Sequence, residues 1–222
     1  MKIDVLTLFP NMFDNFLIES IIGRAIKQNK VSINVHNIRN YSKDPHKKVD
    51  DYPYGGGNGM VLMPQPIFDA VNDLKTDDSF VILLSPQGKV LKQSISYDLS
   101  LKKHLIFICG HYEGFDERIR TLADLELSIG DYILTGGELA TMVVIDSIVR
   151  LIDGVIAEGS HLNDSFNNNL LDYPVYTKPV LYNGLKVPDI LLSGHHENIN
   201  KWRHEQQIKR TKERRPDLLG DD

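Results

Sequence analysis

The sequence is poor in cysteine and has no long hydrophobic run. Cys109 is the only cysteine among 222 residues, so the chain cannot form an internal disulfide, which is typical of a reducing compartment. Apolar stretches such as residues 80–84 have the length of a strand and are far too short to span a membrane. Asp4 interrupts the stretch that a signal peptide would need to be apolar. We therefore expect a soluble protein of the cytoplasm.

The sequence also lacks a large excess of either charge. It has 25 Lys and Arg against 30 Asp and Glu, a net charge of −5, which excludes a histone-like basic protein. With 41% hydrophobic residues, it can bury a core and is not a disordered chain. Residues 201–216 carry seven basic and two acidic side chains, interleaved with Trp202 and His204. This segment is either a solvated helix face or a nucleic-acid surface.

Short apolar runs alternate with helical patterns through the first two thirds of the chain. Strands are expected over residues 3–9, 31–35, 79–84 and 104–109, and helices over 12–26, 91–99 and 139–152. Nearly continuous apolar strands are typical of parallel sheets covered on both faces. The pattern predicts an α/β fold with a largely parallel sheet.

The composition and the hydrophobic pattern of the sequence change after residue 158. Residues 159–169 are polar, with three consecutive asparagines and no periodicity, which indicates a flexible linker. Residues 170–222 contain several prolines and then a helical stretch from about His195 to Arg210, too little chain for a second parallel sheet. We expect an α/β domain over 1–158, the linker over 159–169 and a small, mainly helical domain over 170–222.

Glycine-rich segments follow the expected strands. Residues 84–88, 110–114 and 128–138 each lie at a strand end or a strand-to-helix junction, where open α/β sheets bind ligands. Such loops suit an adenosine-like ligand held by main-chain groups. The densest glycine segment, residues 54–60, lacks the Gly-Lys-Ser/Thr ending of a P-loop, and no G-x-G-x-x-G motif occurs. A Rossmann dinucleotide site is therefore not expected.

Four side chains or clusters have both a structural and a functional interpretation. Cys109 ends an apolar strand, so a buried thiol is favoured over a nucleophile. The histidines around His195 match no zinc spacing. Arg150 lies four residues after Asp146, which fits a surface ion pair, and Asp164 lies in the polar linker, where a turn is the usual role. Periodicity alone makes neither Arg150 nor Asp164 catalytic.

Taken together, these segments resemble the bacterial tRNA (guanine-N1)-methyltransferases that act beside the anticodon. The resemblance spans essentially the whole chain. The motifs that carry it are LTLFP at 6–10, YGGG at 54–57, CGHYEG at 109–114, SIGDYILTGGE at 128–138, DSF at 164–166, LLDYP at 170–174, LSGHH at 192–196 and RRP at 214–216. Mild departures from the usual family pattern are Arg39-Asn40, Asp153, Asn169, Val175 and Lys178.

The resemblance implies a SPOUT-type α/β domain with a deep trefoil knot in which S-adenosylmethionine binds. It implies a homodimer whose active sites use loops of both subunits, and a C-terminal helical domain that binds the tRNA anticodon arm. The implied reaction is methyl transfer from S-adenosylmethionine to N1 of guanine 37 of tRNA. Asp164 would be the general base, and Arg150 would stabilise charge at O6. A magnesium dependence is also implied; the sequence does not place its ligand, and Glu113 is named only as a guess.

Matching motifs assigns two further sets of residues. The cofactor-binding residues implied are Leu84, Ser85, Pro86, Gly110, Tyr112, Glu113, Gly114, Ser128, Ile129, Gly130, Asp131, Tyr132, Ile133, Leu134, Gly136 and Gly137. The tRNA-binding residues implied are His46, Asp50, Tyr54, Gly55, Gly56, Gly57, Lys178, His195, Lys201, Arg203, Arg214 and Arg215. Two alternatives stay open: a knotted methyltransferase acting on ribose 2′-hydroxyls or ribosomal RNA, and a non-catalytic RNA-binding module.

Overall fold

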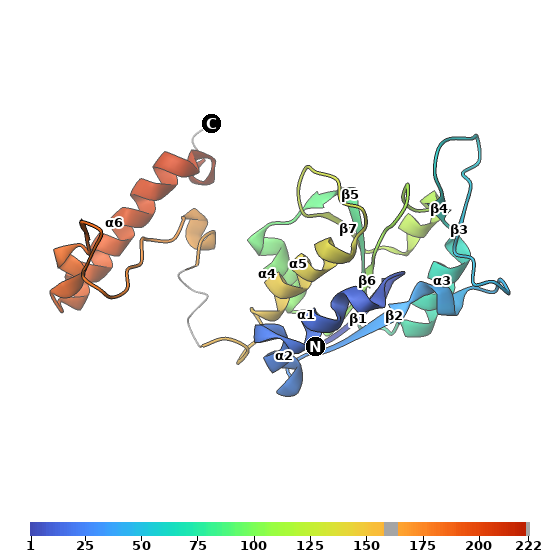
Figure 1. The fold of residues 1–222 in the computed structure, drawn as a ribbon, viewed down its shortest axis with the longest axis horizontal. Coiled ribbons are helices and arrows are strands. Elements are labelled where there is room, and N and C mark those ends of the chain that lie inside the picture. The colour runs from blue at the N-terminus through green and yellow to red at the C-terminus, as the bar shows by residue number, and fades with distance from the viewer. Residues whose placement is uncertain (158–163, 221–222) are drawn as a thin grey trace. The chain divides into compact units, whose positions relative to one another are not determined.

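A computed structural model describes residues 1–157 and 164–220 (Figure 1). The chain divides into two compact units, Met1–Ala157 and Glu158–Asp222. The first unit contains a five-stranded parallel sheet with the strand order β2-β1-β6-β5-β7. The mixed α/β class and the parallel sheet predicted from the apolar runs are confirmed.

The sheet strands are β1 (Lys2–Thr7), β2 (Ser32–Asn37), β5 (Ser79–Val90), β6 (His104–Ile108) and β7 (Leu125–Ser128). Strands β3 (Asp50–Asp51) and β4 (Val61–Leu62) form a separate antiparallel pair. The α-helices of this unit are α1 (Asp14–Ile18), α2 (Ser20–Lys27), α3 (Pro64–Leu74), α4 (Gln93–Ser100) and α5 (Glu138–Val149). Short 3-10 helices are η1 (Pro10–Phe13), η2 (Ile38–Tyr41) and η3 (Glu117–Leu122).

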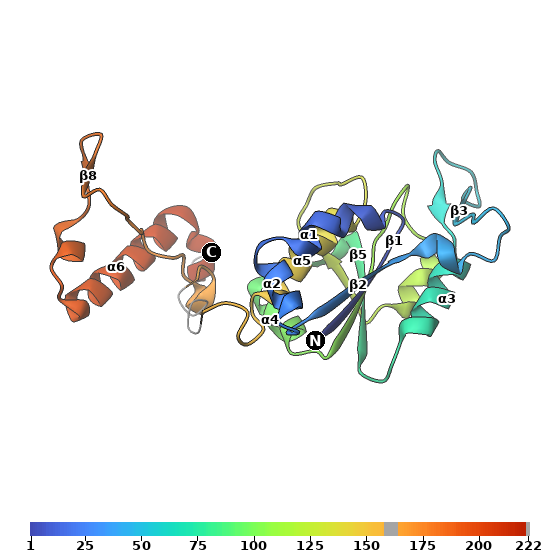
Figure 2. The ribbon, with the colours of Figure 1, turned by 60° about the horizontal axis from the view of Figure 1, so that its bottom comes forward.

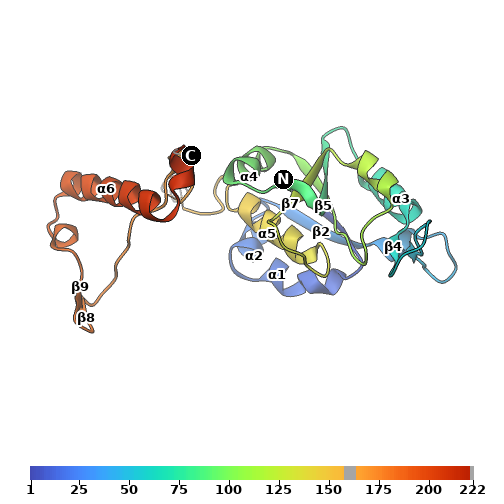
Figure 3. The ribbon, with the colours of Figure 1, turned by 90° about the horizontal axis from the view of Figure 1, so that it is seen from above.

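Helices cover both faces of the sheet, as Figures 2 and 3 show. Helices α1, α2, α4 and α5 pack on one face, where Ile3, Phe107 and Val144 belong to one buried cluster. Helix α3 packs on the other, where Ile67 and Ile106 belong to a second cluster. Because side chains alternate along a strand, the central strand β6 supplies both clusters and is fully buried. This explains its continuous apolar sequence.

The structure differs from the expected helix over residues 12–26, which breaks near Glu19. Glu19 is extended and Ser20 has a positive φ of 51°. The break brings the end of α1 close to the first turn of α2, where a β-carbon on Gly23 would lie 2.2 Å from the carbonyl oxygen of Ile18. The close approach therefore requires glycine at this position.

A second difference concerns β5, which was expected to end at residue 84. It continues to Val90, with a register shift between Leu84 and Lys89, both of which pair with Leu127 of β7. Residues 85–88 leave the pairing at this shift, and a β-carbon on Gly88 would lie 2.4 Å from the backbone nitrogen of Leu127. The segment expected to be a turn is thus an interruption within one long strand.

The second unit is built around α6 (His196–Arg214), longer than the helix expected over 195–210. It also contains a short antiparallel hairpin, β8 (Leu181–Tyr182) and β9 (Leu185–Lys186), and the 3-10 helices η5 (Asn167–Asn169), η6 (Asp189–Leu192) and η7 (Pro216–Leu219). The segment before the hairpin packs on α6, since the buried hydroxyl of Thr211 accepts a 2.9 Å hydrogen bond from the Leu171 amide. Of the predicted linker, residues 159–163 lie outside the described residues.

Candidate functional site

A cleft of about 610 Å³ lies at the carboxyl ends of β6 and β7 and beside the interruption within β5. This is where parallel sheets usually bind ligands, and the volume suits a nucleoside-sized molecule. Three segments that are distant in the sequence line it, residues 84–87, 110–115 and 127–137, and all belong to the first unit. The glycine-rich segments identified from the sequence therefore converge on one site.

Nearly all of the residues assigned to cofactor binding line this cleft. They are Leu84, Ser85, Pro86, Gly110, Tyr112, Glu113, Gly114, Ser128, Ile129, Gly130, Tyr132, Ile133, Leu134, Gly136 and Gly137. Asp131 is exposed and does not contribute to the lining. It occupies the turn between Gly130 and Tyr132, where the amide of Tyr132 donates to the carbonyl of Gly130 at 3.0 Å.

Close backbone packing joins two of these segments. The amide of Gly137 donates to the carbonyl of Gly110 at 2.8 Å, and His111 and Gly136 form an antiparallel bridge. A β-carbon on Gly137 would lie 2.8 Å from the Gly110 nitrogen. The approach of one backbone to another therefore requires glycine at position 137, whereas a β-carbon on Gly110 would meet the ring of Phe115 at 2.9 Å.

The 128–132 turn is fixed by its own hydrogen bonds. The Ser128 hydroxyl donates to the Gly130 carbonyl at 3.0 Å, and the Gly130 amide lies 3.2 Å from the same hydroxyl oxygen. Gly130 has a positive φ of 147°, and the ring of Tyr132 packs over its α-carbon. Ser128 is buried, whereas Tyr132 and Ile133 are exposed at the mouth of the cleft.

The cleft also contains residues that the sequence did not single out for cofactor binding. These are Gln87, His111, Phe115, Glu117, Arg120, Leu127, Thr135 and Ala140. Arg120, on η3, pairs with Glu126 and with Glu117, and it donates to Gln87 at 3.1 Å. The hydrogen bond to Glu126 raises the pKa of Arg120 further, so this cation is held in place at the edge of the cleft.

The glycine loop at residues 54–60 is attached to the cleft segment 110–116. The Glu113 amide donates to the Met60 carbonyl and the Leu62 amide donates to the Gly114 carbonyl, each at 3.0 Å. A β-carbon on Gly59, whose φ is 82°, would lie 2.5 Å from the side chain of Glu113. Gly55, Gly56 and Gly57 also have positive φ, and Tyr54 beside them is fully exposed. His46 is exposed and Asp50 lies on β3, in the segment leading to this loop.

Cys109 is buried at the end of β6, as expected from its apolar neighbours. Burial raises the pKa of its thiol, which lies 3.1 Å from the Thr141 hydroxyl. A thiol in this setting is not a nucleophile at neutral pH.

The two residues proposed as catalytic belong to different units. Arg150 is the C-cap residue of α5, and its amide hydrogen-bonds to the Asp146 carbonyl at 3.3 Å. Asp164 begins the described part of the second unit and is half-buried. Neither residue lines the cleft, so their joint role stays a prediction.

The tRNA-binding residues assigned to the second unit differ in exposure and in whether their side chains already contact other residues of the protein. Lys178, His195, Lys201 and Arg214 are exposed. Arg203 is half-buried, with its guanidinium 4.8 Å above the Tyr173 ring, and Arg215 forms a 2.7 Å ion pair with Asp217. The packing of Arg203 on the Tyr173 ring is enough to explain its position without a role in RNA binding.

The described residues contain no cluster of three or more His, Cys, Asp or Glu side chains that could hold a metal ion. Glu113 in particular has no such neighbours among them, so no metal site is built on it. In the parts of the chain that the structure describes, none of the helices combines the length and apolar character needed to cross a bilayer.

Comparison with known proteins identifies the family. Residues 1–221 match the model of the family described as tRNA (Guanine-1)-methyltransferase TrmD. The chain is 60% identical over 221 residues to the tRNA (guanine-N(1)-)-methyltransferase of Macrococcus caseolyticus, covering 99% of this chain and 92% of that protein. It is 59% identical over 219 residues to the protein with the same name from Malacoplasma penetrans, covering 99% and 97%. The chain therefore belongs to the tRNA (guanine-1)-methyltransferase family.

Proposed function

We propose that this protein transfers a methyl group from S-adenosylmethionine to N1 of guanine 37 in tRNA. The observation that carries the proposal is the convergence of residues 84–86, 110–114 and 128–137 on one cleft in a chain of this family. The relatives are named as tRNA (guanine-N(1)-)-methyltransferases, which supports the base and the atom. Position 37 rests on the resemblance to enzymes that act beside the anticodon.

The cleft supports a nucleoside cofactor by its chemistry. Its walls combine main-chain amides and carbonyls with apolar side chains such as Leu84, Ile129 and Leu134, a combination that suits an adenine ring and a ribose. Gly110, Gly136 and Gly137 allow the segments that form these walls to pack closely together. When bound there, the cofactor supplies an electrophilic methyl group on a sulfonium centre. We propose that the 84–86, 110–114 and 128–134 segments hold it mainly by main-chain hydrogen bonds.

The chemistry of guanine defines what the protein must add. N1 carries a proton and is a poor nucleophile until a base removes it, and negative charge then accumulates at O6. We propose that Asp164 accepts the N1 proton and that the guanidinium of Arg150 stabilises O6. The lone pair on N1 then bonds to the methyl carbon as the carbon–sulfur bond breaks.

Two further features are proposed from the family. The first is a knotted backbone at the cleft, which rests on the resemblance alone. The enzyme is a homodimer, which the exposed Leu139 and Val143, one turn apart on α5, support. Replacing Val143 by Glu should dissociate the dimer in sedimentation velocity. A magnesium dependence is implied by the resemblance alone, and no step above is assigned to the ion.

The second unit supplies a basic surface for the anticodon arm. Exposed side chains along and after α6 include Lys201, Lys209, Lys212 and Arg214. We propose that they contact phosphates rather than bases, because a lysine ammonium is a point charge with little directional readout.

The proposal is tested by mapping the product. The protein is incubated with S-adenosylmethionine and an unmodified tRNA transcript that has guanines at positions 36 and 37, and the nucleosides are mapped by mass spectrometry. We expect N1-methylguanosine at position 37, and none on a transcript carrying adenosine there. A 2′-O-methyl or N2-methyl product would overturn the proposal in favour of another knotted methyltransferase. An absence of cofactor binding in calorimetry would instead favour an RNA-binding module.

A further inference from the structure

Two ionisable side chains meet beneath the cleft, at the α-carbon of Gly136. A β-carbon at this position would lie 2.3 Å from Oε2 of Glu138 and 2.7 Å from Nδ1 of His111. Glu138 opens α5, whereas His111 belongs to the 110–114 segment that lines the cleft. Gly136 has no positive φ, so it is this crowding, and not an unusual backbone conformation, that requires glycine.

Both side chains lack a charged partner. Nδ1 of His111 is buried and has no hydrogen-bond partner among the described residues. Glu138 is 2% exposed and accepts a 2.7 Å hydrogen bond from the Thr7 hydroxyl, but within the described part of the chain it forms no ion pair. A buried carboxyl and a buried ring nitrogen are each costly to leave without a partner, and a proton held between them would satisfy both.

The residues around His111 and Glu138 offer few other hydrogen-bond or ion-pair partners to these two side chains. The His111 ring is held between the rings of Phe9 and Tyr112, with centroids 4.8 and 4.9 Å away. The other titratable groups on these segments are the Cys109 thiol, which contacts Thr141, the Tyr112 phenol and the Glu113 carboxyl. Lys and Arg side chains are absent from the described ion-pair partners of both residues. The imidazole of His111 is the basic group that the structure places beside Glu138.

We infer that His111 and Glu138 share a proton when the cleft is filled, and that this pair holds the 110–114 segment against the start of α5. The inference rests on the proposed cofactor site. A bound cofactor excludes water from the cleft, which strengthens the interaction of an imidazolium with a carboxylate. Nδ1 and Oε2 both lie within 2.7 Å of the position that a β-carbon on Gly136 would take, so the two atoms are near neighbours. The two residues are positioning residues, since they act on the loop and not on the reacting atoms.

Calorimetry tests whether His111 and Glu138 share a proton, because it measures the protons that the protein takes up when S-adenosylmethionine binds. Titrations between pH 6 and 8.5, in two buffers of different ionisation enthalpy, report the protons taken up on binding. We expect the protein to take up part of a proton, and its affinity to fall as pH rises, by up to about tenfold per pH unit where the dependence is steepest. His111→Asn and Glu138→Gln should each bind more weakly at low pH, lose the proton uptake and be non-additive when combined.

The matched control is His196→Asn, which removes an exposed histidine from the start of α6 and should keep the proton uptake. If Glu138→Gln does not fold, His111→Asn alone tests the inference. Full proton uptake on cofactor binding by His111→Asn would overturn it. If the unmodified protein bound the cofactor without taking up a proton, the shared proton of His111 and Glu138 would be ruled out but the proposed function would stand. A protein that bound no cofactor would overturn the proposed function together with the pair.

Discussion

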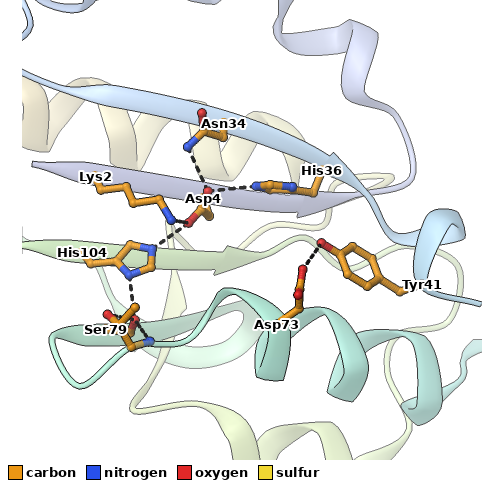
Figure 4. Close-up of polar contacts among 9 residues, drawn as sticks. Lys2, Asp4, Asn34, His36, Tyr41, Asp73, Ser79 and His104 are labelled. Carbon is orange, nitrogen blue, oxygen red and sulfur yellow. Dashed lines mark hydrogen bonds and ion pairs between the residues drawn. The ribbon is translucent and has the colours of Figure 1, made fainter.

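Asp4 and His104 are joined by a 2.7 Å contact between Oδ2 and Nε2, on the sheet face that α3 covers. Figure 4 shows that Asp4 also meets Lys2, Asn34 and His36, while the other ring nitrogen of His104 contacts Ser79 at 2.7 Å. Asp4 is 1% exposed, so a carboxylate within the core is held by groups from three strands. This network lies outside the cleft-lining residues and serves the fold.

Removing the Asp4 carboxylate should destabilise the protein. Asp4→Ala leaves two histidines and a lysine without their shared partner, and we expect the free energy of unfolding to fall by about 3 kcal/mol or more. Urea denaturation followed by circular dichroism measures this. Asp78→Ala is the matched control, since it removes an exposed ion pair with Lys103 and should cost at most about 1 kcal/mol. Equal losses for the two variants would contradict the role of burial.

The same network predicts how stability depends on pH. Burial alone would raise the pKa of Asp4, but hydrogen bonds from His36, Lys2, His104 and Asn34 outweigh it and lower the pKa well below the usual range. The stability that the ionised carboxylate contributes is therefore present above the pKa of an unfolded aspartate, about 3.9, and is lost as pH falls toward the folded value. The difference in unfolding free energy between the unmodified protein and Asp4→Asn should shrink between pH 5 and 3. A constant difference would contradict it.

Gly137→Ala should abolish or greatly weaken cofactor binding. The added carbon would lie 2.8 Å from the Gly110 nitrogen and 3.0 Å from the Cys109 α-carbon, and backbone atoms cannot move aside cheaply. We expect calorimetric affinity for S-adenosylmethionine to fall at least tenfold, about 1.4 kcal/mol. The control is Gly194→Ala in the second unit, which meets no neighbouring atom but strains the backbone at a φ of 74°, and which should still bind the cofactor normally. Normal cofactor binding by Gly137→Ala would show that the close contact between Gly137 and Gly110 is not needed for the cofactor site.

Asp164→Asn separates chemistry from binding. The amide keeps the size of the carboxyl but cannot accept the N1 proton, so single-turnover methylation should slow by about 10²- to 10⁴-fold while both substrates bind normally. Arg150→Ala should also slow the chemical step, and Arg150→Lys should restore only part of it because a lysine ammonium lacks the planar fork. Single-turnover rates at saturating tRNA and cofactor across a pH series measure this. A near-normal rate for Asp164→Asn would require another base.

The salt dependence of tRNA binding should distinguish two basic side chains. Lys209 is exposed on α6, whereas Arg215 is paired with Asp217 and lies near the Phe166 ring. Lys209→Ala should lower the slope of log affinity against log salt by about 0.7–0.9, as one lost phosphate contact would. Arg215→Ala should change it less. Filter binding across salt concentrations measures both slopes, and unchanged slopes for both variants would exclude this surface.

The sequence predicted those elements whose signal is local. Residues 105–108 are all apolar because the central strand is buried on both faces, and the helix ending at Val149 was predictable from its apolar spacing, although Leu139 within that spacing is exposed. The cleft was predictable because its glycines mark strand ends. The break at Glu19 was not, since it depends on the approach of α1 to α2, which periodicity does not report.

Contacts between distant residues could not be predicted. Asp4 was noted only as an interruption of an apolar stretch, because its partners lie at positions 34, 36 and 104. Arg120 gave no signal, since its place at the cleft depends on Glu126 and Gln87. Glu138 and His111 carry no signal of their own within their motifs, because only the packed backbone brings them together at Gly136.

The interruption in β5 links the width of the cleft to the alignment of the sheet. Leu84 and Lys89 both pair with Leu127, so residues 85–88 act as a spacer of fixed length whose first three members form one wall of the cleft. Inserting or deleting one residue there would have to be absorbed either by that wall or by the Val90–Ser128 pairing that follows. This segment therefore cannot vary in length as surface loops do, and it can adapt to a different ligand only by substitution.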